Sequence, residues 1–307
     1  MAELYIGLMS GTSLDGVDGV LADFSGTGVR VLAHAARPFE APLRAELLAL
    51  NTRGSDELHR AALAANALVA VYTQVVHDLL AASDVPATAV RAIGAHGQTV
   101  RHQPQAFGGT GYTLQLNNPA LLAERTGVDV VADFRSRDVA AGGQGAPLAP
   151  FFHQALFAVP GQTVGVLNLG GISNLSLLHA DGGVLGFDCG PANALMDAWC
   201  ERHSGRAYDA NGDFAASGNL DEALLARLLD DAWFALPPPK STGREQFHLD
   251  WLASKLAGDE SAADVQATLL ELSAATVADA LRAAQPGTKH VLACGGGVHN
   301  PRLLARI

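Results

Sequence analysis

Positive charge is scarce in this 307-residue chain. Its 20 lysines and arginines are outnumbered by 31 aspartates and glutamates, which gives a formal net charge of −11 at pH 7. This balance argues against a nucleic acid or an anionic membrane as the partner. It leaves a polyphosphate open, because backbone N–H groups and a metal ion can bind one in an acidic protein.

Cysteine is also rare, and the residue patterns of metal sites are missing. The three cysteines, Cys189, Cys200 and Cys294, are odd in number and form no C-x-x-C pair, which fits a reducing cytoplasm better than a disulfide framework. Eleven histidines include His96 and His102, but no H-E-x-x-H motif accompanies them, so a structural zinc site is not expected.

Targeting and membrane-spanning signals are not seen. Residues 1–3 lead directly into an apolar strand pattern, without a basic region or a cleavage site. The longest apolar run, residues 61–76, contains Asn66 and Gln74 and is shorter than the ~18 residues that a span needs. We therefore expect a buried helix there. The hydrophobic content of 49% favours a globular protein, and the length allows two domains.

The stretch of residues 6–18 is the most informative one. Apolar runs at 4–9 and 17–24 flank a polar turn, and this pattern predicts strand, turn, strand. The turn offers hydroxyls, carboxylates and backbone N–H groups that can form an anion-binding nest. It is not a Walker A loop, because Val17 and Asp18 stand where Lys and Ser or Thr are required. By itself it also fits an ordinary solvated hairpin.

Two later stretches extend this pattern. Residues 167–177 again predict a strand, a Gly/Ser/Asn turn and a strand, and residues 291–301 predict a strand that enters a glycine triplet. Asn300 and Pro301 then suit the N-cap and first position of a helix. Two such hairpins and a late glycine triplet resemble the layout of the actin, sugar-kinase and Hsp70 superfamily. In that superfamily the hairpins grip a nucleotide from opposite domains.

The order of the remaining patterns indicates an α/β protein with two similar halves. Strands precede alternating helices and strands in each half, with no fixed-period repeat. A Gly-rich stretch at 140–147 suits a hinge, and we expect domains at 1–138 and 139–307. The proline-rich loop 236–244 is either a linker or part of a nucleotide pocket.

Six motifs in order resemble the anhydro-N-acetylmuramic acid kinases of bacterial cell-wall recycling, and they extend over the whole chain. They are 7–18, 96–102, 131–138 with 142–148, 168–174, 186–193 and 294–297. The resemblance implies a two-domain actin-like ATPase fold with duplicated βββαβα-type domains. It also implies that water opens the 1,6-anhydro ring of 1,6-anhydro-N-acetylmuramic acid, while O6 takes the γ-phosphoryl of ATP.

The same resemblance assigns roles to individual residues. Asp188 would be the general base for the water, and a carboxylate is already ionised at neutral pH. Its place before Gly190 and Pro191 also fits a plain helix N-cap. His96 equally suits a hydrogen-bonded core histidine, and Arg135 a solvated surface charge. Sugar-side residues would be His96, Gln98, Thr99, Asp133 and Arg135.

The nucleotide side follows from the hairpins and the triplet. Mg²⁺ is expected with ATP, and Asp15 is the first candidate for its ligand. The expected ATP-binding residues are Ser10, Gly11, Thr12, Ser13, Leu14, Asp15, Gly16, Val17, Asp18, Gly170, Gly171, Ser173, Asn174, Gly295, Gly296 and Gly297.

Family members continue beyond the point where this chain stops, at residues 303–307. The second domain is therefore expected to be truncated at its C-terminus. A non-catalytic nucleotide- or sugar-binding remnant of the same fold is the alternative to the kinase. The family further suggests a homodimer, with no nucleic acid or membrane partner.

Overall fold

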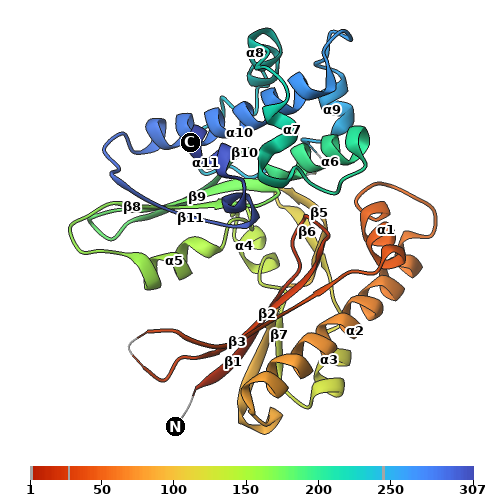
Figure 1. Ribbon diagram of the computed structural model, residues 1–307. Coiled ribbons are helices and arrows are strands. Elements are labelled where there is room, and N and C mark those ends of the chain that lie inside the picture. Colours follow the sequence, from red (N-terminus) through yellow and green to blue (C-terminus); the bar gives the residue numbers. More distant parts are fainter. Residues whose placement is uncertain (1–2, 27, 244–245) are drawn as a thin grey trace. The chain divides into compact units, whose positions relative to one another are not determined.

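The computed structural model describes residues 3–26, 28–243 and 246–307. The chain forms two compact units, the first ending at Gly145 and the second beginning at Ala146 (Figure 1). The boundary expected from the sequence was 138/139, just before the glycine-rich stretch 140–147, whereas the observed boundary lies within that stretch.

The first unit is built on a five-stranded sheet in the order β3-β2-β1-β4-β7. Strands β1, β2 and β3 are antiparallel, while β4 and β7 continue the sheet in parallel with β1. A separate ribbon pairs β5 with β6. The elements are β1 (Leu4–Met9), β2 (Gly16–Asp23), β3 (Arg30–Pro38), α1 (Ala41–Ala49), α2 (Glu57–Ser83), β4 (Val90–Ala95), β5 (Gln98–Pro104), β6 (Gly111–Leu116), α3 (Pro119–Thr126), β7 (Val130–Ala132) and α4 (Ser136–Ala140).

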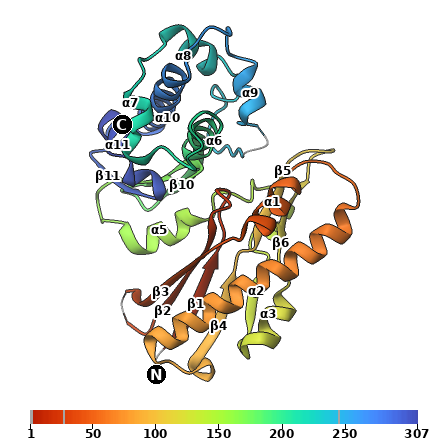
Figure 2. The same cartoon turned by 45° about the vertical axis from the view of Figure 1, so that its right-hand side comes forward.

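Helix α2 is the central helix of this unit and packs along the sheet (Figure 2). Its buried face includes Leu68, Tyr72, Val76 and Leu79, which join the strand residues in one hydrophobic core. It is long and apolar enough to span a membrane by length and composition, but half of its most apolar window is buried inside the fold. The expected buried helix at 61–76 is therefore confirmed as the core helix of this unit.

The second unit repeats the same sheet order with β10-β9-β8-β11. Strands β8, β9 and β10 are antiparallel, and β11 is parallel to β8. The elements are α5 (Ala149–Phe157), β8 (Val164–Leu169), β9 (Ile172–Leu178), β10 (Val184–Pro191), α6 (Asn193–Ser204), α7 (Asp213–Ala216), α8 (Glu222–Leu229), α9 (Leu249–Ala253), α10 (Ala262–Ala284), β11 (His290–Cys294) and α11 (Pro301–Arg306).

Helices α5 and α10 cover opposite faces of this sheet. The side chains of Leu175 and Phe187 enter the hydrophobic core with α10. Their strand neighbours Ser176 and Gly186 face α5, where His153 Nδ1 lies 2.8 Å from Ser176 Oγ. Alternate strand residues point to opposite faces, so the polar residues two positions along from Ser176 and Gly186 share the α5 face.

The polar run after residue 97, for which the sequence predicted no strand, forms strand β5, because β6 supplies its hydrogen-bonding partner. Helix α5, which follows the glycine-rich stretch 140–147, was not predicted. Pro191 ends strand β10 and does not open a helix, which begins at Asn193. The loop expected at 236–244 is present to residue 243, and Arg244 lies outside the described residues.

Candidate active site

A row of polar side chains crosses the sheet of the second unit. Asn168 on β8 pairs with Asn174 on β9, and Asn174 pairs with Asp188 on β10. Directly paired residues point to the same side of a sheet, which here is the α5 face. These three side chains lie at the end of the sheet where the β8–β9 turn is, so a carboxylate and two amides are presented together.

Asp188 is the charged member of this row and is only 6% exposed. Its backbone N–H donates to the carbonyl oxygen of Lys240 at 2.9 Å, and its Oδ2 accepts from the Thr242 N–H at 2.9 Å. We call residues 240–242 the strap. Hydrogen bonds from backbone N–H groups favour the charged form of a carboxylate, so the strap supports an ionised Asp188.

The structure excludes the alternative that Asp188 is a helix N-cap. The N-cap residue of α6 is Ala192, four positions beyond Asp188, and it makes no side-chain cap. Instead, the carbonyls of Gly170 and Gly171 accept hydrogen bonds from the N–H groups of residues 192–194, at 3.0–3.1 Å. Asp188 therefore has no part in starting the helix.

The β8–β9 turn and the glycine triplet lie against each other. A Cβ on Gly295, whose φ is 84°, would come within 2.4 Å of Asn168 Oδ1. A Cβ on Gly297 would lie 2.6 Å from the Cβ of Leu169, so the approach requires glycine at both positions. The structure thus places Gly295 and Gly297 against Asn168 and Leu169, at the end of β8 that leads into Gly170 and Gly171. Ser173 is fully buried, and its Oγ donates to the carbonyl of Gly190 at 3.0 Å.

In the first unit, the β1–β2 turn is closed by a hydrogen bond from the Leu14 N–H to the carbonyl of Gly11. Ser13 Oγ donates to Asp15 Oδ1 at 2.7 Å, so these two side chains act as a pair. Leu14 and Val17 are buried core residues, and their side chains belong to the packing of the sheet. Thr12 and Gly16 lie in the same turn and strand start.

The carboxylate of Asp18 does not pair with Ser13 or Asp15 and lies beside His34 instead. It lies on the exposed face of β2, and its Oδ1 is 3.3 Å from Nε2 of His34 on β3. Among the described residues, no group of three or more His, Cys, Asp or Glu side chains is placed to hold a metal ion. Asp15 therefore fits Mg²⁺ only as a single carboxylate beside phosphate oxygens, which is how Mg²⁺ is commonly held in kinases.

Ser10 belongs to a closed ring of hydrogen bonds. Its Oγ donates to the Gly97 carbonyl at 3.1 Å and lies 3.2 Å from the Tyr72 hydroxyl, which accepts from the Gly97 N–H at 3.0 Å. Since the proton of Ser10 goes to Gly97, the hydroxyl of Tyr72 must donate to Ser10. This buried ring fixes the end of β1 to the β4–β5 junction.

His96 at that junction is neutral and has a defined tautomer. Arg135 Nε donates to His96 Nε2 at 2.8 Å, so the ring proton is on Nδ1, which donates to the Gly97 carbonyl at 2.7 Å. Burial, with the Arg135 charge as a second cause, lowers the pKa of His96 to about 4. The same two causes lower the pKa of His102 to about 4. Arg135 is thus a hydrogen-bonding partner and not a solvated surface charge.

The other proposed sugar-side residues have separate partners. Gln98 is fully buried; its Nε2 donates to the Gly11 carbonyl at 3.1 Å, and its Oε1 has no hydrogen-bonding partner within residues 3–26, 28–243 and 246–307. Thr99 Oγ1 accepts from Gln115 Nε2 at 3.1 Å. Asp133, with a φ of 59°, accepts from Ser136 Oγ at 2.5 Å. Gln98 therefore links the first turn to β5, while Asp133 lies in the loop that leads to Arg135.

The two units repeat one sheet order, each has a turn after its first strand, and the glycine triplet lies beside the second turn. This arrangement defines an actin-like ATPase fold of the sugar-kinase, Hsp70 and actin superfamily. The α/β fold expected from the sequence is thereby confirmed. The family model described as anhydro-N-acetylmuramic acid kinase matches residues 3–307. The chain belongs to the anhydro-N-acetylmuramic acid kinase family.

Two relatives from curated proteins carry the name of this family. The anhydro-N-acetylmuramic acid kinase of Albidiferax ferrireducens is 58% identical, covering 100% of this chain and 85% of its own length. That of Variovorax paradoxus is 60% identical, covering 99% and 83%. Among solved structures, component A of (R)-2-hydroxyglutaryl-CoA dehydratase from Acidaminococcus fermentans matches with a TM-score of 0.49 at 11% identity, covering 99% of this chain and 87% of that one.

Some residues of the site were not predicted. The sequence placed Tyr72 in a buried helix without assigning it a role. It also left two interpretations for the loop 236–244, which contains the strap: a linker or part of a nucleotide pocket. Tyr72 is 62 residues from Ser10, and Thr242 is 54 residues from Asp188. Contacts over such separations have no local periodicity that could reveal them. A lysine with hydroxyl residues inside a loop was the only signal available.

Proposed function

We propose that this chain is the kinase that opens the 1,6-anhydro ring of 1,6-anhydro-N-acetylmuramic acid and phosphorylates O6 with ATP, giving N-acetylmuramic acid 6-phosphate and ADP. The observation that carries the proposal is the family match over residues 3–307. The buried, hydrogen-bonded carboxylate of Asp188 supports it independently, because the reaction needs a base for water.

In this reaction Asp188 accepts a proton from a water molecule while the water oxygen bonds to C1 of the sugar. The bond between C1 and O6 breaks, and O6 then bonds to the γ-phosphorus of ATP as the bond to the ADP oxygen breaks. Because phosphoryl transfer depends on positioning and charge neutralisation, the turn at 10–18, the turn at 170–174 and the triplet at 295–297 are proposed to hold ATP. Asp15 would be the carboxylate that holds Mg²⁺, and the ion, when bound, would neutralise charge at the phosphates.

The sugar is proposed to bind His96, Gln98, Thr99, Asp133 and Arg135. His96 and Arg135 already form one hydrogen-bonded pair, and Gln98 Oε1 is a buried acceptor without a partner among the described residues. We further propose a cytoplasmic homodimer. All three cysteines are free thiols, which suits a reducing compartment, and sedimentation would test the dimer.

The test mixes the protein with Mg·ATP and the anhydro-sugar in water enriched in ¹⁸O. We expect a 6-phosphate that carries ¹⁸O on the sugar and none on the phosphate, because water attacks C1. Asp188→Asn should lower kcat by about 10²–10⁴-fold. Asp181→Asn, at the turn of the same β9–β10 hairpin, is the matched control and should behave like the unaltered protein.

The alternative, a non-catalytic binding protein, gives a different result. It would bind ATP or the sugar without consuming ATP, and Asp188→Asn would change nothing. The family match and the retained Asp188 favour the kinase, because relatives 58–60% identical over nearly the whole of this chain are named for that activity. Failure of the sugar to stimulate ATP consumption would overturn the proposal.

A further inference from the structure

The strap lies along strand β10, the outermost strand of its sheet, and bonds both the backbone and the side chain of Asp188. Lys240 accepts from the Asp188 N–H, and the Thr242 N–H donates to Asp188 Oδ2, each at 2.9 Å. The register of β10 against β9 shifts between Asp188 and Gly190, so the regular ladder alone does not fix this position. The orientation of the Asp188 carboxylate therefore depends on the position of the strap.

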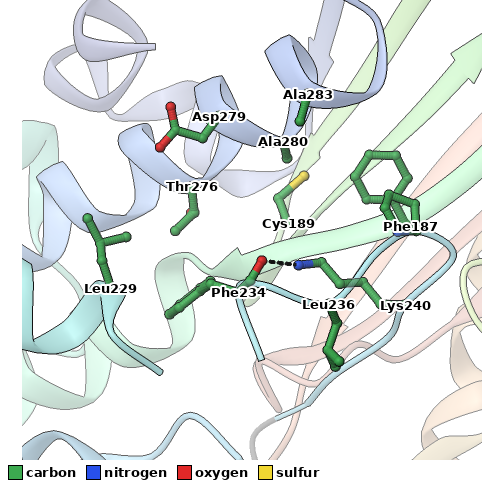
Figure 3. A pocket seen from close by; sticks show the side chains of 11 residues that line it. Phe187, Cys189, Leu229, Phe234, Leu236, Lys240, Thr276, Asp279, Ala280 and Ala283 are labelled. Atoms are coloured by element: carbon green, nitrogen blue, oxygen red, sulfur yellow. Dashed lines mark hydrogen bonds between the residues drawn. The ribbon is translucent and has the colours of Figure 1, made fainter. Parts of the chain in front are cut away.

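Lys240 anchors the strap. Its Nζ donates to the carbonyls of Trp233 at 3.2 Å and Phe234 at 2.9 Å, and it lies 4.2 Å from the centroid of the Trp233 ring. Figure 3 shows the Lys240 side chain pointing to the Phe234 carbonyl. Trp233 holds the strap a second time, since its Nε1 donates to the Ser241 carbonyl at 3.3 Å.

The anchor is itself part of a packed aromatic cluster. Trp233 is 7% exposed, and its ring meets those of Phe234 and Phe247 edge-on at centroid distances of 5.5 and 5.4 Å. Phe247 also meets Trp251 edge-on, at 4.9 Å. Such interlocked rings have little freedom to move, so a side chain bonded to Trp233 is held in a fixed place.

The ammonium group of Lys240 lies in surroundings that are largely apolar, which is unusual for a charged group. Lys240 lines a cavity of about 310 Å³ whose other walls include Phe187, Leu236 and Ala280. Burial lowers the pKa of Lys240, while its electrostatic interactions with Cys189 and Asp188 act in the opposite direction. A methionine would fill the same space without the cost of desolvating a charge. The cation at this position is therefore expected to have a role beyond filling the space.

We propose that Lys240 is a positioning residue for Asp188: pinned to Trp233 and Phe234, it holds the strap so that the Asp188 carboxylate is oriented and kept ionised for proton transfer from water. This inference rests on the proposed function of Asp188 as the base. Lys240 touches neither substrate in this mechanism and acts only through the strap and through its positive charge.

The test compares Lys240→Met with Lys240→Arg. In Lys240→Met we expect kcat to fall about 10- to 100-fold with little change in either KM, because the base is misplaced and binding groups are untouched. The acidic limb of the kcat/KM profile should move to higher pH, since loss of a cation and of a hydrogen bond both favour the protonated carboxylate. Lys240→Arg keeps a charged donor and should keep the limb near its original pH.

Lys289→Met is the matched control, because it removes an exposed lysine of the same unit. Amide exchange of peptides spanning 185–192, measured without substrate, provides a readout independent of turnover. It should become faster in Lys240→Met and stay unchanged in Lys289→Met. If Lys240→Met fails to fold, Trp233→Phe removes only the donor to Ser241 and the larger ring; it should lower kcat with a smaller shift of the limb.

The outcomes separate the two proposals. An unaltered protein that does not consume ATP with the sugar overturns the proposed function, and the exchange measurement then still decides whether Lys240 fixes Asp188. An acidic limb at its original pH together with unaltered exchange in Lys240→Met overturns the positioning role. A limb that moves equally in Lys240→Met and Lys240→Arg also overturns it, because the charge and the donors would then not matter.

Discussion

Tyr72→Phe should destabilise the first unit by breaking the ring that joins Tyr72, Ser10 and Gly97. The Tyr72 side chain is fully buried, and phenylalanine retains nearly all of its apolar surface. What is lost is one acceptor for the Gly97 N–H and one donor to Ser10 Oγ. Burial raises the pKa of Tyr72 to about 12, so the hydroxyl is a proton donor at every working pH.

The magnitude follows from the buried N–H of Gly97. Leaving such a donor unpaired costs about 1–3 kcal/mol, whereas removal of an exposed hydrogen bond costs about 0.5 kcal/mol or less. Tyr5→Phe is the matched control, because the Tyr5 hydroxyl only contacts Glu3 at 3.5 Å, at the edge of the same sheet. Ser10→Ala should cost less than Tyr72→Phe, since the Gly97 carbonyl still accepts a hydrogen bond from His96 Nδ1.

Native-state amide exchange is the suitable assay, because two units need not unfold together. The free energy of opening in α2 and β1 should fall by about 1–3 kcal/mol in Tyr72→Phe. All three tryptophans, Trp199, Trp233 and Trp251, belong to the second unit, so the denaturant transition seen by tryptophan fluorescence should stay in place. If the opening free energies are equal in Tyr72→Phe and Tyr5→Phe, the hydrogen-bonded ring does not stabilise the first unit as we expect.

Two further predictions concern pH and the bulge in β10. The pKa of His96 and of His102 is about 4 in the native state and near 6.5 when unfolded, so the unfolded chain binds more protons between these two pH values. The stability of the first unit should therefore fall by roughly 1–3 kcal/mol per histidine as the pH drops from 6.5 to 4. Amide exchange measures this fall, and the pH profile should be flatter in His96→Gln. Gly190→Ala should lower the tryptophan-detected denaturation midpoint, at a cost of about 1–3 kcal/mol, and should reduce kcat, because φ is 152° and the new Cβ would lie 2.9 Å from Phe234 Cε1. Gly287→Ala, with open space around it, should do neither.

The order of helices and strands was predictable because short-range sequence patterns indicate it. The hairpin 4–24 and the Asn300–Pro301 helix start are short-range signals, and the structure has both, with Asn300 Oδ1 accepting from the N–H groups of residues 302 and 303. Strand β5 was missed because its residues are polar; β6 stabilises it through backbone bonds that side-chain periodicity does not report. Pro191 was misassigned because a proline is tolerated at the end of an outermost strand as readily as at a helix start.

The family resemblance indicated the residues of the candidate site. It did not indicate the residues with which they form hydrogen bonds. No pattern in the sequence could indicate that Arg135 donates to His96, 39 residues away, and thereby fixes its tautomer. The strap illustrates the same limit. The prolines at 237–239, just before the strap, predict a loop, but only the fold brings residues 240–242 against Asp188.

The repeated sheet order has a consequence for synthesis on the ribosome. The sheet of the first unit is complete once β7 ends at Ala132, and its neighbours β1, β2 and β3 are consecutive in the chain. In the second unit, β8 must wait for β11, residues 290–294, to emerge before its parallel partner exists. The first unit can therefore fold while the second is still being made, and until then β8 has an open edge that is free to pair wrongly.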